Sequence, residues 1–230
     1  MSEDIDEISR VTRPRAAAQA AYDRMSGWYD WLTAGGERRL TNLGLQKLDV
    51  KKGEKVLEIG FGTGHALVEL AKAVGSLGRI CGIDISRGML NVAGDRLKTI
   101  GLANRVEMTR GDAIQLSYEK DFFDAILMSF VLELFDTPEI PGLLAKCRRV
   151  LRRGGRLCVV SLARRDRLAV RLYEWFHRRF PVYVDCRSIY AKQSIQAAGF
   201  EVLESTEKKM WGLPVEIVLA GVPQERNGTR

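Results

Sequence analysis

The sequence predicts an α/β protein with a doubly wound, mostly parallel sheet of seven strands, preceded by a helical segment. Short apolar runs that suit buried strands alternate with amphipathic helical stretches, which is typical of βαβ units. The first strand leads directly into a glycine-rich turn and a helix, "VLEIGFGTGHALVELA". Near the carboxyl end, two strands are joined by a short link that contains glycine and proline, so we expect the last strand to pair antiparallel.

The spacing of apolar residues places each element along the chain. We expect helices at about 15–32, 37–48, 65–75, 87–100, 138–151, 164–179 and 187–198. We expect strands at about 53–60, 78–85, 105–112, 121–130, 154–162, 200–207 and 215–222. Gly75 and Gly101 end two of the helices, and Pro138 opens another, as the first turn of a helix permits.

Length and composition favour one globular domain. Of the 230 residues 46% are hydrophobic, which is enough for a core without cross-links. The four cysteines lie far apart and form no C-x-x-C pair, which argues against a disulfide framework or a zinc site. The acidic start lacks an apolar stretch, and no apolar run approaches the ~20 residues of a membrane-spanning helix. We therefore expect a cytoplasmic protein without a signal peptide or a metal, at most peripheral to a membrane.

The net charge of +7 is unevenly distributed along the chain. Between Arg148 and Arg187 there are twelve arginines and no lysine, against three acidic residues. Such a basic window predicts a one-sided basic surface and an anionic partner. Nucleic acid, an anionic membrane and an acidic substrate all fit that description.

The glycine-rich turn is the strongest functional signal. Gly60, Gly62 and Gly64 follow the first strand directly, where residues without Cβ allow a tight turn and let a ligand lie against the backbone. The next helix presents its free N–H groups at the carboxyl ends of the strands, where α/β sheets bind ligands. A tight turn without a ligand is the alternative, but three alternating glycines exceed what it requires. We interpret the loop as a nucleotide-type site.

The spacing of the loop argues against two common nucleotide sites. Dinucleotide enzymes use G-x-G-x-x-G, whereas His65 occupies the position of the last glycine here. A P-loop requires G-K-[ST], which does not follow. Glu58 precedes the loop, and a carboxylate at that place suits a ligand that carries positive charge.

Five motifs resemble, in order and spacing, those of the class I S-adenosylmethionine-dependent methyltransferases. "VLEIGFGTG" is similar to their first motif, and "GIDIS" to the segment with their ribose-binding acid. "RGDA" resembles the adenine-contacting segment, "FFDAILMSFVLELF" the fourth-strand motif, and "CRRVLRRGGRLCVV" the helix and strand after it. The match extends from about Gly53 to Leu162. It implies a Rossmann-like fold and S-adenosyl-L-methionine as the cofactor.

The resemblance assigns cofactor contacts to residues at the strand ends and in the N-terminal segment. These are Glu58, Gly60, Phe61, Gly62, Thr63, Gly64, Asp84, Ile85, Met89, Asp112, Ala113, Ser129, Phe130, Tyr22 and Tyr29. Asp84 is expected to accept the ribose hydroxyls, although it can also be the N-cap of a helix. Glu58 is expected to orient the loop or to bond the cofactor's amino group through a water.

The adenine and the methyl donor are expected at neighbouring strand ends. Ile85 and Met89 are expected to sandwich the adenine, with Asp112 near its amine, although Met89 can equally be plain core. Ser129 and Phe130 are expected beside the methyl-donor end of the cofactor.

The N-terminal stretch "AYDRMSGWYDWLT" is similar to the opening of the ubiquinone/menaquinone C-methyltransferases and their phospholipid N-methyltransferase relatives. In that group the helices before the core fold over the cofactor. One departure concerns the stretch "SFVLELFD", where the quinone enzymes carry an arginine and an asparagine and this chain has Glu133 and Leu134. The departure argues against quinone C-methylation. Glu133 is a candidate base or amine-binding residue, or else a solvated residue at a strand end.

The segment at about 164–180 reads as a basic amphipathic helix with Trp175 and Phe176 on its apolar side. Such a helix can lie on an anionic membrane or wall an acceptor pocket, or its aromatic residues can be core. His177 within it is a second weak catalytic candidate, whereas His65 is expected to face the cofactor or solvent. We therefore divide the chain into an N-terminal helical lid (1–48), a methyltransferase core (49–222) with an acceptor-pocket insertion at about 163–187, and a tail (223–230).

The function predicted is methyl transfer from S-adenosylmethionine to a small, lipophilic acceptor, either quinone-like or a phospholipid headgroup. A nucleic-acid methyltransferase is a less favoured alternative, because the chain has no appended RNA-binding module and no N/D-P-P-Y/F-type motif after the fourth strand. A non-catalytic, cofactor-binding scaffold is a third possibility. The expected partners are the substrate and an anionic membrane, and the sequence leaves the oligomeric state open.

Overall fold

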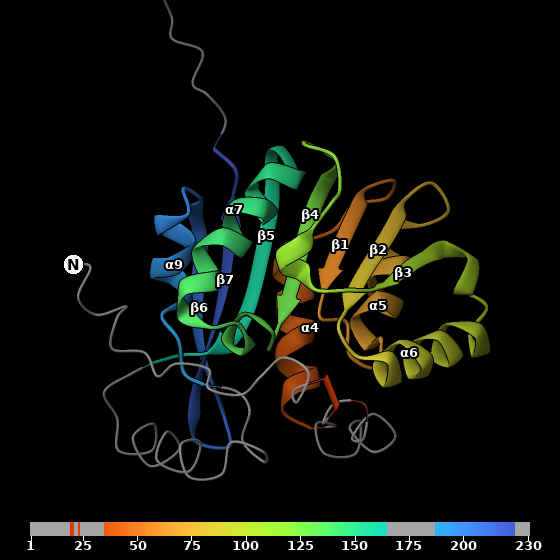
Figure 1. Cartoon of the computed structure of the whole chain (residues 1–230), viewed down its shortest axis with the longest axis horizontal. Coiled ribbons are helices and arrows are strands. Elements are labelled where there is room, and N and C mark those ends of the chain that lie inside the picture. Colours follow the sequence, from red (N-terminus) through yellow and green to blue (C-terminus); the bar gives the residue numbers. More distant parts are fainter. Residues whose placement is uncertain (1–18, 21–22, 24–34, 165–186, 224–230) are drawn as a thin grey trace, which may run out of the picture.

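The computed structural model describes residues 19–20, 23, 35–164 and 187–223. These residues form a seven-stranded sheet in the order β3-β2-β1-β4-β5-β7-β6, with helices on both faces (Figure 1). The strands from β3 to β5 are parallel, and β7 runs antiparallel to β5 and β6. The predicted fold class, including the antiparallel last strand, is confirmed.

The elements of the described chain follow the predicted order. The strands are β1 (Lys55–Ile59), β2 (Arg79–Asp84), β3 (Val106–Arg110), β4 (Phe123–Ser129), β5 (Leu151–Leu162), β6 (Glu201–Met210) and β7 (Leu213–Gly221). The helices are α4 (Glu37–Leu48), α5 (His65–Val74), α6 (Arg87–Thr99), α7 (Ile140–Val150) and α9 (Ala191–Ala197). Short 3₁₀ turns are η1 (Ala103–Arg105), η2 (Ala113–Gln115), η3 (Leu132–Leu134) and η4 (Thr137–Glu139).

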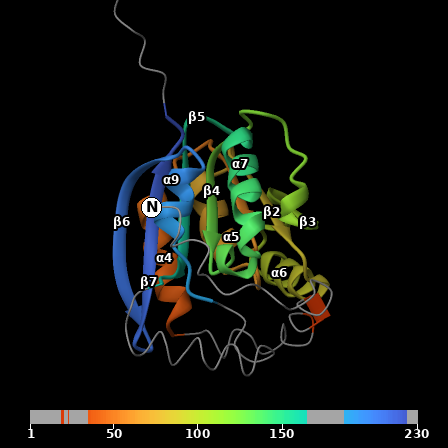
Figure 2. The same cartoon turned by 60° about the vertical axis from the view of Figure 1, so that its left-hand side comes forward.

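Two apolar layers hold the helices to the sheet. On one face α4, α5 and α6 bury residues such as Leu48, Leu67 and Leu97. On the other face α7 and α9 bury Leu144 and Ile195 (Figure 2). The central strands are apolar on both sides, as expected for parallel strands covered by helices. This packing holds the carboxyl ends of the parallel strands β1, β2, β3 and β4 side by side at one end of the sheet.

Three element boundaries differ from those expected. The helix expected from residue 138 begins at Ile140, because the preceding residues form η4, closed by a capping box between Asp136 and Glu139. The fifth strand begins at Leu151, directly after α7. The helix expected from Arg187 begins only at Ala191, because the residues before it are extended and buried and one of them bridges to β5.

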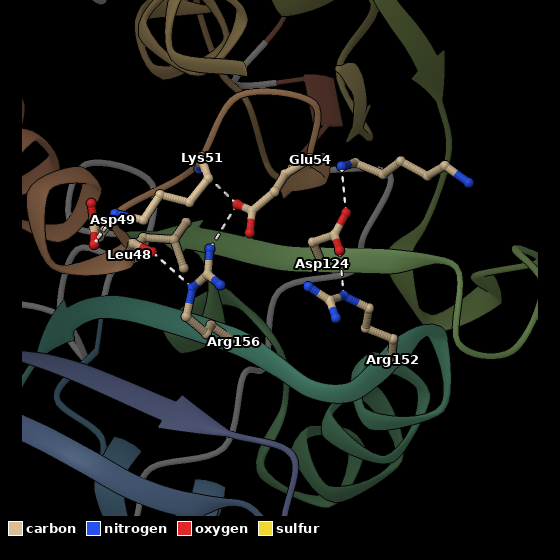
Figure 3. Close-up of polar contacts among 8 residues, drawn as sticks. Leu48, Asp49, Lys51, Glu54, Asp124, Arg152 and Arg156 are labelled. Carbon is tan, nitrogen blue, oxygen red and sulfur yellow. Dashed lines mark hydrogen bonds and ion pairs between the residues drawn. The ribbon is translucent and has the colours of Figure 1, made fainter. Parts of the chain in front are cut away.

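A cluster of paired charges fixes the opposite, amino end of the sheet (Figure 3). Arg156 on β5 donates from Nε to the Leu48 carbonyl at 2.9 Å and from its guanidinium to Glu54 Oε2 at 2.7 Å. The same oxygen accepts the backbone N–H of Lys51 at 2.8 Å. These bonds tie the end of α4 and the start of β1 to β5.

Several expectations lie outside the described residues. They include Tyr22, Tyr29, His177, the helix at 164–179 and most of the helix at 15–32. Within the lid expected over 1–48, the described helix α4 packs on the sheet through Leu40, Gly44 and Leu48. The division into lid, core and tail stays a prediction.

Candidate active site

The glycine loop joins β1 to α5, and glycine is required at its three glycine positions for different structural reasons. A Cβ on Gly60 would lie 2.2 Å from Val131 Cγ2, and one on Gly64 would lie 2.8 Å from the Cβ of Ala93 on α6. These two glycines are therefore required by close packing. A Cβ on Gly62 would meet no described residue within 4 Å, although its φ of +51° also favours glycine. Gly62 is thus the loop position that faces open space and can let a ligand approach the backbone.

Asp84 at the end of β2 is held by backbone N–H groups on both sides. Its Oδ2 accepts the N–H of Gly62 at 2.9 Å, and its Oδ1 accepts the N–H of Ser86 at 2.8 Å. Burial nevertheless raises the pKa of the Asp84 carboxyl above its ordinary value. The N-cap of α6 is Ser86, whose hydroxyl accepts the N–H of Met89 at 3.1 Å. The alternative in which Asp84 caps that helix is therefore wrong.

Glu58 lies near the end of β1 with its side chain buried. Burial, with a smaller contribution from the nearby Asp84 charge, raises the pKa of its carboxyl well above the ordinary value. Its Oε2 has no hydrogen-bond partner within the part of the chain that the structure describes. A buried, unsatisfied carboxylate oxygen is unfavourable unless a donor completes it. Glu58 therefore fits a ligand that brings an ammonium group or a bridging water.

Asp23 is a site residue that the sequence analysis did not single out. Its Oδ1 accepts the hydroxyl of Ser86 at 2.5 Å and the N–H of Gly88 at 2.9 Å. These bonds lower the pKa of the Asp23 carboxyl, so that a negative charge is held at the start of α6. Asp23 is the third residue of the quoted stretch "AYDRMSGWYDWLT", and that motif was the available signal. Through Ser86, Asp23 connects to Asp84.

The residues expected to contact the adenine lie at the ends of β2 and β3 and at the start of α6. Ile85 is half-buried, and Met89 on α6 is buried. Asp112 caps η2 by accepting the N–H of Ile114 at 3.0 Å, and Ala113 is buried in the core. The N–H of Gly111 bonds the Asp84 carbonyl at 2.9 Å and so brings this segment beside the ribose acid.

The other expected loop residues divide between core and site. Phe61 and Phe130 are both buried in the apolar layer shared with α4 and α5. A Cβ on Gly82 would lie 2.8 Å from Phe61 Cδ1, so the Phe61 ring covers β2. Ser129 shares a 2.7 Å hydrogen bond with Thr41 of α4, and Thr63 is buried in the loop. The rings of Phe61 and Phe130 therefore support the loop from the apolar layer on the α4 and α5 side of the sheet.

Glu133 lies in η3, where the chain leaves β4, and its side chain is fully buried. Its Oε1 accepts the N–H of Leu162 at 3.2 Å, at the end of β5, and its Oε2 has no hydrogen-bond partner among the described residues. Burial raises the pKa of the carboxyl to about 8. The alternative of a solvated residue at a strand end is therefore wrong, because the side chain is buried and bonds the backbone at the end of β5.

Arg187 is a second residue that the sequence analysis missed. It is 1% exposed and donates from Nε to the Glu133 carbonyl at 3.1 Å and from its guanidinium to Thr137 Oγ1 at 2.7 Å and the Phe135 carbonyl. It therefore fixes the loop that presents Glu133. A buried arginine at the edge of an arginine-rich window has no sequence signal that separates it from the solvated ones.

The described arginines of the basic window do not all lie on one side, and those at 165–186 lie outside the described residues, so the one-sided basic surface stays a prediction. Arg152 and Arg156 contact Asp124 and Glu54 at the amino end of the sheet, whereas Arg187 is buried at the carboxyl end. The reason is geometric, since β5 carries the window across the whole sheet. At the loop, His65 contacts the Arg38 guanidinium of α4 through Nε2.

Comparisons with known proteins agree with this geometry. Residues 56–155, which carry the glycine loop, Asp84, Asp112 and Glu133, match the model of a methyltransferase domain. Over these 100 of its 230 residues the chain is similar to the class I S-adenosylmethionine-dependent methyltransferases. The cofactor of that class is S-adenosylmethionine, and the open Gly62, the buried Glu58 and the oriented Asp84 fit it.

Two relatives extend the similarity beyond the domain. The chain is 33% identical over 152 residues to the 2-phytyl-1,4-naphtoquinone methyltransferase of Synechococcus elongatus, which covers 64% of each protein. It is 29% identical over 159 residues to the ubiquinone/menaquinone biosynthesis C-methyltransferase UbiE of Vibrio campbellii, covering 69% of this chain and 60% of the relative. The chain thus spans less than two thirds of the length of these relatives.

Solved structures show the same fold. A SAM dependent methyltransferase from Aquifex aeolicus aligns with TM-score 0.61 and 23% identity over 79% of this chain and 89% of that one. The [4+2]-cyclase SpnF aligns with TM-score 0.73 and 20% identity over 94% and 99%. Because this methyltransferase-like fold also supports a cyclase, the reaction has to be argued from the site.

Proposed function

We propose that the protein transfers a methyl group from S-adenosylmethionine to a small, lipophilic acceptor, quinone-like or a phospholipid headgroup. The observation that carries the proposal is the pairing of a complete cofactor loop with a buried carboxyl, Glu133, at the neighbouring strand ends. Named quinone methyltransferases among the relatives, at about 30% identity, support the lipophilic acceptor.

The cofactor supplies an activated methyl group on a sulfonium centre. In the proposed roles, Glu58 binds its ammonium end, Gly62 admits it to the backbone, and Asp84 accepts its ribose hydroxyls. The two backbone bonds to Asp84 orient its carboxylate before anything binds, so little ordering is required on binding. Asp112, Ile85 and Met89 bound the adenine pocket.

Glu133 is the proposed acid–base group on the acceptor side. With a pKa of about 8 it is mostly protonated at neutral pH and can donate a hydrogen bond to a carbonyl or hydroxyl oxygen. In its ionised form it can remove a proton from the acceptor, and a pKa close to the working pH suits that role. A cationic headgroup bound beside it would lower its pKa and favour the ionised form. His177, the other candidate, stays a prediction.

Quinone and phospholipid acceptors place different demands on this position. A neutral Glu133 suits the oxygen of a quinol, although the quinone C-methyltransferases carry an arginine and an asparagine in this stretch, where this chain has Glu133 and Leu134. An ionised Glu133 suits an amine. The membrane contact through 164–180 remains a proposal on residues outside the described part. No helix within the described residues is long and apolar enough to cross a bilayer.

The test combines labelled S-adenosylmethionine with a total lipid extract from the source of the protein. Label in a quinone ring or in a phospholipid headgroup supports the proposal and selects the acceptor class. Cofactor binding without label in any lipid contradicts the lipophilic acceptor. A parallel incubation with RNA and water-soluble metabolites from the same source that also stays unlabelled contradicts methyl transfer. Asp84→Asn is the active-site variant and should lose the cofactor. Asp95→Ala, on the exposed side of α6, is the matched control.

A further inference from the structure

The turn between β6 and β7 exposes an aromatic ring in a backbone conformation that disfavours it. Met210 pairs with Leu213, so Trp211 and Gly212 form a two-residue hairpin turn. Both have positive φ, +49° and +83°, as type I′ turns require. Asparagine or aspartate usually occupies the first position, because a bulky residue is strained there. Trp211 is strained and yet leaves 68% of its surface exposed.

The position of this turn sets Trp211 apart from the other exposed large hydrophobic residues of the described chain. Leu77, Ile100 and Leu203 lie toward the amino end of the parallel strands. Trp211 lies at the carboxyl end, since Val215, two residues into β7, pairs with Leu162 at the end of β5. Figure 1 shows this turn and the start of α4 at the end of the molecule to which β1 points. The exposed ring is therefore on the active-site side.

Basic residues lie near this turn, both on β6 and at the start of α4. Lys208 and Lys209 are exposed on β6 directly before the turn. Gly36, at the start of α4, packs on the turn, because a Cβ there would lie 3.4 Å from Trp211 Cε2. Arg39, three residues along α4, is exposed at the same end. Lys47, at the other end of α4, contacts Glu204 and fixes the antiparallel alignment of α4 with β6.

We propose that Arg39, Lys208, Lys209 and Trp211, the hairpin patch, dock the protein on an anionic lipid bilayer. Tryptophan favours the boundary between headgroups and acyl chains, and each nearby cation adds attraction to anionic lipid. A strained, exposed tryptophan is retained at a cost to folding, which points to a role in binding. The patch is separate from the segment 164–180 and does not depend on methyl transfer.

The test measures sedimentation with phosphatidylcholine vesicles containing one third phosphatidylglycerol, without cofactor or acceptor. The native protein should bind these vesicles and should bind pure phosphatidylcholine vesicles only weakly. It should be released in 1 M salt, because the Debye screening length is then only about 3 Å. Trp211→Asn should bind roughly tenfold less while its Tm is unchanged or ~3 °C higher, since asparagine suits the turn. Lys208→Glu with Lys209→Glu should reduce binding at least ~30-fold.

The matched controls change exposed residues at the other end of the sheet. Leu77→Ala, at 89% exposure, and Lys98→Glu with Lys120→Glu should leave vesicle binding unchanged. Binding that survives Trp211→Asn and the double lysine reversal would overturn the proposal. So would equal binding to neutral vesicles, or binding to RNA that the same variants abolish while vesicles are not bound. Cofactor affinity should be the same in every variant, which keeps this result distinct from the test of the reaction.

Discussion

A buried glutamate lies at each end of β1, and the two differ in how their carboxylates are hydrogen-bonded. At the amino end, the Glu54 carboxylate accepts hydrogen bonds from Arg156 and from the Lys51 backbone (Figure 3). At the carboxyl end, Glu58 is more deeply buried but keeps one oxygen without a partner among the described residues, and its pKa is raised. Glu133, one strand away, has the same features. The amino end is electrostatically satisfied and holds the fold, whereas the carboxyl end carries the unsatisfied groups typical of a functional site.

At neutral pH, the largest expected effect of a single substitution is on stability and comes from breaking the amino end. Arg156→Ala should lower the free energy of unfolding by about 2–3 kcal/mol, because it leaves a largely buried Glu54 without its cation. Denaturant unfolding should show this loss while cofactor affinity, measured by calorimetry on the folded protein, stays the same. A weakened affinity with unchanged stability would contradict the division between the two ends. Lys72→Ala is the control. It breaks an exposed ion pair with Glu69 on α5 and should change the free energy of unfolding little.

The pH dependence of stability should come largely from the carboxyl end. The folded-state pKa of Glu133 is about 8, above its unfolded value, so the native state binds more protons between about pH 4.5 and 8. Stability should therefore fall as pH rises through this window, by up to roughly 1.4 kcal/mol per pH unit. Thermal unfolding of Glu133→Gln between pH 6 and 8.5 should show a shallower slope than the native protein. An unchanged slope would rule out Glu133 as the titrating group.

Glu58→Gln sharpens the contrast within one strand. Removing a buried, unpaired charge should leave stability at neutral pH unchanged or slightly higher, because the desolvation cost of the ionised form disappears. The same change should weaken S-adenosylmethionine binding by about tenfold, the loss of one charge-assisted hydrogen bond. Calorimetry measures both quantities on one sample. A variant that is less stable and binds the cofactor normally would reverse the assignment.

The smallest expected effect concerns Asp23. Asp23→Ala should weaken cofactor binding about threefold, because Ser86 and the start of α6 lose the acceptor that orients them beside Asp84. Asp23→Asn keeps an acceptor oxygen in the same place and should restore most of the affinity. If both variants bind equally weakly, the charge at the helix start matters more than the geometry. If both bind normally, Asp23 has no part in the site.

Part of the site was predictable because its signals are local. The alternation of apolar strands and helices located β1, β2 and β4 to within a few residues, and the glycines marked the loop. An acid directly after the second strand indicated Asp84. Local patterns did not show why each glycine is needed. Only the tertiary contacts show that Gly60 packs against Val131 and Gly64 against Ala93, and that space remains beside Gly62.

The sequence by itself determined the fold class, the methyltransferase-type cofactor loop and the place of Asp84, because hydrophobic period and turn chemistry act over a few residues. Only the tertiary structure decided that Glu133 is buried, that Arg156 and Arg187 are internal anchors, and that Asp23 reaches Ser86. These are contacts between residues 29 to 102 positions apart. Their energies depend on burial and on partners that folding brings together, and no local pattern of residue types records either.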